Sequence, residues 1–168
     1  MFGKILFIND NVAHVENTFG ANQDAQNDLM NMHVIFEDND QRVLGEVTEF
    51  NQELIKIRFL GEFISGKYVN GVLRKPSLTA QIRVINAEEL QELVGTNKEE
   101  NFPLGMSAVY KDFMVYPNVN ALFSNHLAIF GNSGSGKSCG VARIVQNLFT
   151  SRGLLSYNAN LFIFDAYG

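Results

Sequence analysis

The sequence predicts a mixed fold, with a small all-β barrel at the N-terminus followed by the incomplete first part of an α/β domain. Three observations point to this fold. Apolar and polar residues alternate in the first half, a continuous apolar run in the second half leads directly into a glycine-rich turn, and helical apolar spacing follows that turn. A chain of 168 residues, 46% of them hydrophobic, is long enough to bury the cores of one or two small domains.

Alternation with a period of two predicts strands over residues 1 to about 85. Ile55, Ile57 and Phe59 alternate with Lys56 and Arg58, as expected of a strand with one buried face. Further candidate strands lie at residues 4–8, 12–18, 30–37, 42–49, 67–73 and 80–84. Clusters of Asn, Asp, Gly and Ser separate these segments, and about seven short strands at this spacing are typical of a small barrel or sandwich.

Residues 17–28 are rich in Asn, Gln and Asp and predict a long exposed loop, either disordered or a partner-binding tip. A short helix is then predicted, with Asn86 as its N-cap, Glu89 three residues later and Gly95 at its end. The polar stretch 96–103 marks the domain boundary. We therefore expect a β-barrel assembly domain over residues 1–100 and an α/β domain that begins within 101–168.

The second half has the pattern of an α/β unit. The apolar run 127–130 predicts a central parallel strand buried on both faces. Apolar residues at helical spacing predict an amphipathic helix over 137–149, and a second apolar strand is expected at 161–164, ending at Asp165. Strand, glycine-rich turn, helix and strand in this order begin many nucleotide-binding domains.

Charge and cysteine content narrow the function classes. Residues 1–100 hold nine Lys and Arg against sixteen Asp and Glu, so their formal charge is −7, which disfavours a grip on nucleic acid and favours protein partners. The chain has a single cysteine, Cys139, and no apolar stretch long enough to span a bilayer. We expect a cytoplasmic protein that does not contact membranes.

The glycine-rich turn fits the P-loop pattern G-x-x-x-x-G-K-[ST] at every required position. Its glycines let the backbone N–H groups point inward, and the following helix offers an N-terminus that favours anions. Lys137 would neutralise the β- and γ-phosphates of ATP, and the Ser138 hydroxyl would hold Mg²⁺. The predicted cofactor-binding residues are Gly131, Asn132, Ser133, Gly134, Ser135, Gly136, Lys137, Ser138 and Cys139.

Other polar residues receive less specific predictions. Asp165, at the end of a predicted strand, is either a metal-side carboxylate or an acid that orients a neighbour. Cys139 is expected to be a small packed residue of the helix. The three histidines, His14, His33 and His126, are too isolated to suggest a metal site. No nucleophile–base pair can be identified, so catalytic residues stay unassigned.

The P-loop and its surroundings resemble the HerA-type ATPases of the HerA–FtsK group. The resemblance rests on His126 before the P-loop strand, on the P-loop itself, and on Asp165-Ala166-Tyr167-Gly168, which matches the family's Asp-x-x-Gly signature. In the family this signature is normally followed by Glu-Tyr. Members of the family also begin with a small β-barrel of about this length.

The resemblance implies an ATPase of the helicase or translocase type, built as a hexameric ring that moves along double-stranded DNA. It also implies a partner, either a nuclease or a sirtuin-like effector, with a possible role in antiviral (antiphage) defence. Two alternatives remain. The barrel could be an assembly or docking module with nucleotide as a structural or regulatory ligand. The chain could also be a small GTPase-like switch in which Asp165 is a metal-side residue.

In the family the acidic catalytic strand, the sensor residue and the arginine supplied to the neighbouring subunit lie beyond the position equivalent to Gly168. We therefore expect the parent protein to be an ATPase and this 168-residue chain alone to hydrolyse ATP negligibly. A phosphate-release assay on the isolated chain would measure this, and turnover at a rate typical of an intact ATPase would contradict it.

Overall fold

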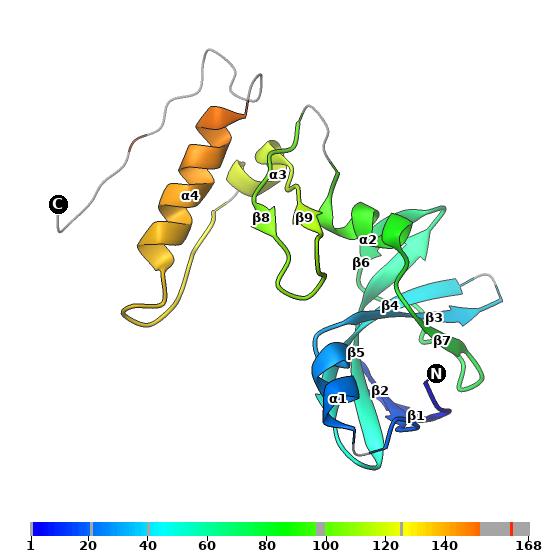
Figure 1. The fold of residues 1–168 in the computed structure, drawn as a ribbon. Coiled ribbons are helices and arrows are strands. Elements are labelled where there is room, and N and C mark those ends of the chain that lie inside the picture. Colours follow the sequence, from blue (N-terminus) through cyan, green and yellow to red (C-terminus); the bar gives the residue numbers. More distant parts are fainter. Residues whose placement is uncertain are drawn as a thin grey trace. The chain divides into compact units, whose positions relative to one another are not determined.

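The computed structural model describes residues 2–20, 22–39, 41–96, 100–124, 126–151 and Phe162. The chain divides into two compact units, Met1–Leu93 and Val94–Gly168, called unit 1 and unit 2 below (Figure 1). None of the helices in the described ranges is long and apolar enough to cross a membrane.

Unit 1 is built on one antiparallel sheet of seven strands. The strand order is β1-β2-β5-β4-β3-β7, and β6 pairs with the far end of β5. The strands are β1 Ile5–Asn9, β2 Val12–Glu16, β3 His33–Asp38, β4 Gln41–Phe50, β5 Leu54–Ile64, β6 Lys67–Asn70 and β7 Gln81–Val84. The predicted β structure of the first half is confirmed by these pairings.

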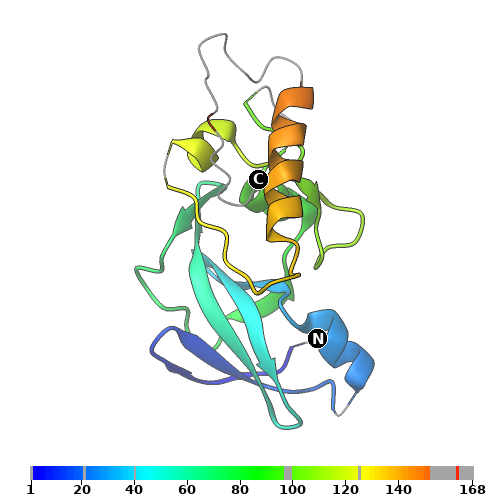
Figure 2. The ribbon, with the colours of Figure 1, turned by 90° about the vertical axis from the view of Figure 1, so that its left-hand side faces the viewer.

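The sheet curls into a half-barrel because its two longest strands bend (Figures 1 and 2). The register between β4 and β5 shifts twice, between Leu44 and Gly45 and between Val47 and Glu49. Such bulges bend a strand and increase its twist. No pairing joins β1 to β7 in the described part of unit 1, so the predicted barrel is only half closed.

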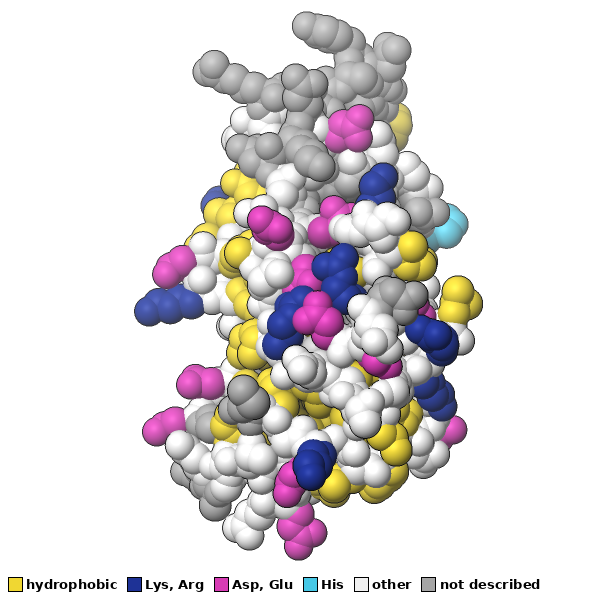
Figure 3. All heavy atoms as spheres, turned by 90° about the vertical axis from the view of Figure 1, so that its right-hand side faces the viewer, with side chains coloured by type: hydrophobic (Ala, Val, Ile, Leu, Met, Phe, Trp, Pro, Cys, Tyr) yellow, Lys and Arg dark blue, Asp and Glu magenta, His cyan; other side chains and the backbone are white. Residues whose placement is uncertain are grey.

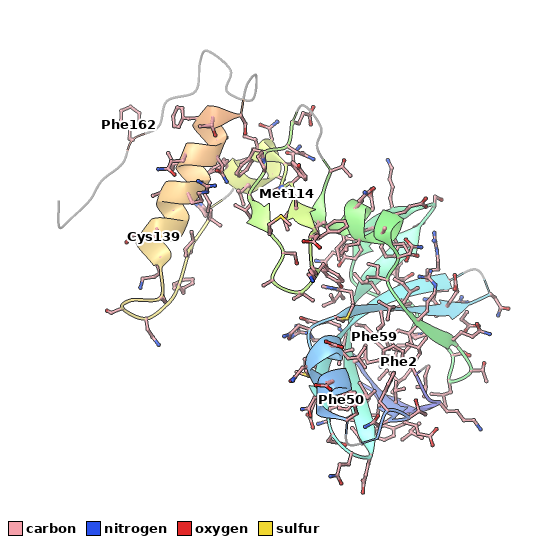
Figure 4. The ribbon with its side chains drawn as sticks, in the orientation of Figure 1. Phe2, Phe50, Phe59, Met114, Cys139 and Phe162 are labelled. Atoms are coloured by element: carbon pink, nitrogen blue, oxygen red, sulfur yellow. The ribbon has the colours of Figure 1, made fainter. Side chains whose placement is uncertain are left out.

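The core of unit 1 lies on the inner face of the curl. Phe36 and Phe59 meet edge to face there with ring centroids 5.1 Å apart, and both are almost fully buried. Figure 4 shows Phe2, Phe50 and Phe59 gathered on this inner side. Alternate residues of β2 and β5 complete the core, which is why their sequences show a period of two. In β4 the alternation is broken, because Val43, Leu44 and Gly45 are buried in succession at the first register shift.

The prediction of an exposed loop over residues 17–28 is wrong in part, because helix α1, Gln23–Leu29, occupies its second half. The Asn22 side chain accepts a hydrogen bond from the Asp24 N–H at 2.9 Å, which starts the helix. Leu29 at its end is buried in the core. One apolar anchor and one cap therefore hold a segment whose composition alone favours a loop.

Helix α2, Ala87–Val94, begins with the predicted capping box. The Asn86 side chain accepts from the Glu89 N–H at 2.9 Å, and the Glu89 carboxylate accepts from the Asn86 N–H at 3.1 Å. The prediction of a short helix capped by these two residues is confirmed.

The Glu89 carboxylate also fastens α2 to the sheet. Although Glu89 is buried, it accepts two hydrogen bonds from the Arg83 guanidinium, at 2.7 and 2.8 Å, and lies 3.4 Å from Arg42. Arg83 in turn pairs with Glu37 at 3.1 Å. The hydrogen bonds from Arg83 hold the pKa of Glu89 below its usual range, despite the opposing effect of burial.

Unit 2 contains a two-stranded sheet and two helices among its described residues. The elements are β8 Gly105–Met106, β9 Met114–Val115, α3 Val119–Phe123 and α4 Lys137–Thr150. Asn118 caps α3 by accepting from the Ala121 N–H at 2.9 Å. Phe102 is fully buried and faces Phe123 at 6.3 Å between ring centroids.

The predicted strand at 127–130 is wrong for this structure, in which the segment has no regular secondary structure. Leu127 and Ile129 are half exposed, and Phe130 is 91% exposed. A parallel strand takes its hydrogen bonds from neighbouring strands, and no described strand lies alongside these residues. The predicted helix 137–149 is confirmed as α4, whereas the predicted strand 161–164 lies outside the described residues except for Phe162.

Replacing Glu89 with alanine should lower the stability of unit 1 by about 2 kcal/mol. Breaking a fully buried ion pair costs about 3–5 kcal/mol, but Arg83 keeps 33% of its side chain exposed, so water moderates the loss. Native-state hydrogen exchange at the β3 amides that pair with β7 would measure it. Glu88→Ala, an exposed neighbour in the same helix, is the control and should change stability by less than about 0.5 kcal/mol.

The contribution of Glu89 should depend on pH. Because the folded-state pKa of Glu89 is lowered, its stabilisation is fully present above the unfolded-state value of about 4.3 and is lost as the pH falls through the lower folded-state value. The stability difference between the wild type and Glu89→Gln should therefore be largest near neutral pH and shrink below about pH 4. A difference that stayed constant down to pH 2 would contradict this assignment of the charge.

Candidate functional site

The glycine-rich turn leads directly into α4. Ser135 N–H donates to the Asn132 carbonyl at 3.2 Å, which closes the turn. Gly136 is the N-cap of α4, and the first hydrogen bond of the helix runs from Gly140 N–H to the Gly136 carbonyl at 2.8 Å. The amides of Lys137, Ser138 and Cys139 therefore precede the first backbone hydrogen bond of the helix.

Glycine is favoured at three positions of this turn for two reasons. Gly134 and Gly136 have φ of 79° and 86°, a left-handed conformation that residues with a Cβ adopt at a cost. At Gly131 the reason is space, because a Cβ there would lie 2.5 Å from the Ser135 hydroxyl oxygen, which would have to turn away.

Lys137 extends back over the turn. Its ammonium Nζ donates to the Asn132 carbonyl at 2.6 Å, so the side chain spans from the first residue of α4 to the start of the loop. It is half-buried, whereas the other residues from Gly131 to Cys139 are exposed. The first turn of α4 contains no acidic residue, so nothing in that turn opposes the positive charge.

A shallow open depression of about 270 Å³ lies at this end of α4, lined by Gly134, Gly136, Lys137, Ser138 and Cys139. Its lining combines free helix amides, one ammonium group and one hydroxyl. Amides at a helix N-terminus and a lysine are the groups that bind phosphate in proteins, and the macrodipole of a 14-residue helix adds to the attraction. The residues present therefore fit a phosphate-bearing ligand.

The two residues that follow the lysine are both accessible. Ser138 is exposed in the first turn, where its hydroxyl is open to a cation held by a phosphate. Cys139 is also exposed, so the expectation that it is a packed helix residue is wrong (Figure 4). The apolar stripe of α4 runs through Ile144, Val145 and Leu148, and Cys139 lies outside that stripe.

Asp165, the second predicted metal-side residue, lies outside the described residues, as do its neighbours up to Gly168. Among the described residues, no group of three or more His, Cys, Asp or Glu side chains could hold a metal ion. Of the three histidines, His14 is stacked on Phe7 with ring centroids 4.1 Å apart, His33 lies in β3 and His126 is exposed.

Sequence reasoning missed Asn147, which fastens α4 to the rest of unit 2. Its side-chain amide donates to two successive carbonyls, that of Pro103 at 2.7 Å and that of Leu104 at 3.0 Å. Buried Leu148 follows it directly. The available signal was a polar residue beside the apolar stripe of an amphipathic helix, where a side chain either faces solvent or has a specific partner.

Replacing Asn147 with alanine should destabilise unit 2 by about 1–3 kcal/mol, because two partly buried carbonyls lose their donor. Hydrogen exchange at the amides of α4 would measure the loss. Gln146→Ala, an exposed neighbour in the same helix, is the matched control and should change the protection by less than about 0.5 kcal/mol. Equal effects of the two substitutions would show that the Asn147 contacts do not hold the helix.

Comparison with known proteins bears on the same segment. Residues 102–168 match the family described as the central domain of the helicase HerA, a range that includes the whole glycine-rich turn and α4. No curated protein matches the chain. Members of this family are ATPases and are generally oligomeric. The match and the P-loop pattern agree, so residues 102–168 are similar to the central domain of HerA-type ATPases.

Proposed function

We propose that residues 131–139 bind the phosphates of ATP, and that this chain is the N-terminal part of a HerA-like, ATP-driven DNA translocase. The chain would supply the nucleotide-binding loop and a β-rich assembly domain. The intact protein would work as a ring, with ATP bound by the P-loop of each subunit. The family match covers residues 102–168 and supports the ATPase part of this proposal.

One observation carries the nucleotide proposal. The first three residues of α4, Lys137, Ser138 and Cys139, line the depression together with Gly134 and Gly136, and Lys137 is the cation among them. A triphosphate brings several negative charges to this place, and each amide can donate to a phosphate oxygen without breaking a helix hydrogen bond. Lys137 can exchange its contact with the Asn132 carbonyl for a charge-assisted bond to phosphate.

Magnesium fits the same site through the phosphates. Mg²⁺ keeps several waters and takes only one or two protein oxygens in such sites, so the exposed Ser138 hydroxyl suffices as a protein ligand in the described part. We propose Asp165 as a further metal-side residue on the basis of its position in the sequence. When bound, Mg²⁺ would neutralise charge on the phosphates, while Lys137 and the helix amides orient them.

The proposal of a wider role rests on the resemblance to HerA-type ATPases. We propose movement along double-stranded DNA, a hexameric ring, cooperation with a nuclease or sirtuin-like effector, and a role in antiphage defence. The acidic balance of residues 1–100 supports a protein-facing rather than a DNA-facing role for unit 1. DNA contact would then fall to the ATPase part of the ring.

A second candidate function is that unit 1 is a docking module and that nucleotide is a structural or regulatory ligand. The observation in its favour is that unit 1 has a complete hydrophobic core of its own. Such a unit can present a surface whether or not the P-loop is occupied. Both functions can hold in one protein, since they use different residues.

Lys137→Ala should weaken binding of ATP with Mg²⁺ by on the order of a hundredfold, because it removes the charge-assisted contact to phosphate. Titration calorimetry on the full 168-residue chain would measure the affinity. Lys111→Ala, a change of the same chemistry at an exposed site in unit 2, is the control and should bind as the wild type does.

Equal binding by the wild type and Lys137→Ala would show that the phosphate site lies elsewhere. Competition between ATP and GTP in the same titration tests the remaining alternative, a small GTPase-like switch. A clear preference for GTP would favour a GTPase-like switch over a HerA-type ATPase.

A further inference from the structure

The sequence contains a single Asn-Gly pair, Asn70-Gly71, and it lies where β6 ends (Figure 1). Both residues are exposed. Gly71 has φ of 88°, and the space on the side where a Cβ would stand is open. Among the described strands β6 pairs with β5 alone, so the pair lies at the end of a short edge strand.

An asparagine followed by glycine holds both reactants of an intramolecular reaction. The backbone nitrogen of the glycine can attack the side-chain amide carbon of the asparagine and close a succinimide ring. The two groups are joined by the chain, so they meet without the entropic cost of a bimolecular encounter. Glycine has no side chain to obstruct the approach, which makes this pair more reactive than asparagine before any other residue.

The Tyr68 hydroxyl is placed to assist this reaction. It donates to Asn70 Oδ1 at 3.4 Å, a long hydrogen bond. Negative charge develops on Oδ1 when a nitrogen attacks the amide carbon, so a donor at this oxygen stabilises the transition state. Burial raises the pKa of Tyr68 above its usual value, so the hydroxyl keeps its proton at the mildly alkaline pH that favours the attack.

The sheet fixes the ring that carries this hydroxyl. Tyr68 pairs with Phe63 across β5 and β6, with ring centroids 5.9 Å apart. The Tyr68 ring also lies over Gly61, where an added Cβ would come within 2.6 Å of a ring carbon. Asn70 is the cross-strand partner of Gly61, so the side chains of Tyr68 and Asn70 lie on the same face of β6.

The folded chain restrains the attacking nitrogen. Gly71 N–H donates to the Leu60 carbonyl at 3.0 Å, and the nitrogen must leave this bond before it can attack. The bond lies just beyond the last residue of β6, so its opening leaves the pair of Tyr68 and Phe63 in place. Strand ends open at a small fraction of the free energy of global unfolding. Local fraying therefore suffices to start the reaction.

We propose that Asn70 is a site of self-modification, in which the Gly71 nitrogen attacks the Asn70 side-chain amide with assistance from Tyr68. Solvent base takes the Gly71 amide proton, a bond forms from this nitrogen to Asn70 Cγ, and the Cγ–Nδ2 bond breaks to release ammonia. Water then opens the succinimide. Cleavage of the new N–Cγ bond gives aspartate, whereas cleavage of the original peptide C–N bond gives isoaspartate. The reaction consumes water and needs no redox partner.

The modification would act on the loop of residues 71–78, which joins β6 to β7. Side chains of the sheet hold the backbone of this loop. The hydrogen bonds are those from Leu73 and Arg74 N–H to the Glu62 carboxylate at 2.6 and 3.4 Å, from the Gln41 side chain to the Arg74 carbonyl, and from Ser77 N–H to Asp38 at 3.2 Å.

Isoaspartate carries the chain through its side chain, which adds a methylene to the backbone just before these anchors. The product also adds negative charge to residues 1–100, whose formal charge is already −7. On the face shown in Figure 3, Lys and Arg side chains lie next to Asp and Glu side chains, and that face has no extended basic area to neutralise a new carboxylate. Hydrogen exchange at the Leu73 and Arg74 amides should therefore be faster in the modified chain than in the fresh one.

The test is peptide mapping by mass spectrometry of the full chain, kept folded at mildly alkaline pH over days. The peptide that contains Asn70 should gain the mass that separates a carboxyl group from an amide, and enzymatic methylation should detect isoaspartate in it. Asn9 is the matched control within the same chain. It is also the exposed last residue of a strand, but Asp10 follows it, so it should stay unmodified over the same period.

Tyr68→Phe tests the assistance. Phenylalanine keeps the ring that packs on Phe63 and loses the hydroxyl, so the rate at Asn70 in the folded chain should fall about fivefold, the value of one hydrogen bond. In concentrated denaturant the variant and the wild type should react at the same rate, because the hydroxyl is held beside Oδ1 only in the folded chain. Asn70→Gln disfavours the ring closure and should leave the mass of this peptide unchanged.

Two results would overturn the inference. If Asn70 stayed unmodified in the folded chain while the denatured chain reacted, the bond to Leu60 would protect the pair rather than gate it. If Tyr68→Phe reacted as fast as the wild type in the folded chain, the hydroxyl would have no part in the reaction. Lys137→Ala should modify Asn70 at the wild-type rate, so failure of the proposed ATP site would leave this result unchanged.

Discussion

A helix cannot satisfy the first amides of its own backbone, and this constraint shapes unit 2. In α4 the residue before the first turn is Gly136, which has no side chain that could cap those amides, and the turn contains no acid that could neutralise Lys137. Most helices meet this constraint with a Ser, Thr, Asp or Asn cap, as α3 does with Asn118. Leaving α4 open costs stability at that end, and the contacts of Asn147 and Leu148 at the other end offset it.

The parts of the structure that could be predicted from sequence are those whose determining residues lie within a few positions of one another in the chain. The capping box of Asn86 and Glu89 and the glycine-led start of α4 are local, and both are found where the sequence places them. The period of two in β5 has a local signature as well, although its partners are distant. The open half-barrel could not be predicted, because closure depends on whether β1 meets β7.

The features that were predicted wrongly or missed depend on contacts with residues that are distant in the chain. The apolar run 127–130 has the composition of a buried strand, but a strand exists only when neighbours supply its hydrogen bonds, and sequence does not say whether they are present. In 17–28, composition favoured a loop, yet one cap at Asn22 and one buried leucine produce a helix. Asn147 was missed because its partners, two backbone carbonyls, leave no mark in the sequence.

In the connection between β6 and β7, the loop of residues 71–78 is positioned through its backbone amides and carbonyls, by Glu62, Gln41 and Asp38 on the sheet. Its shape therefore depends little on which side chains stand at Leu73, Arg74 and Lys75. Substitutions at these three positions would therefore change the chemistry of the exposed tip while the backbone that presents them keeps its path. The separation of shape from chemistry makes this loop a place where the surface can change without loss of the fold.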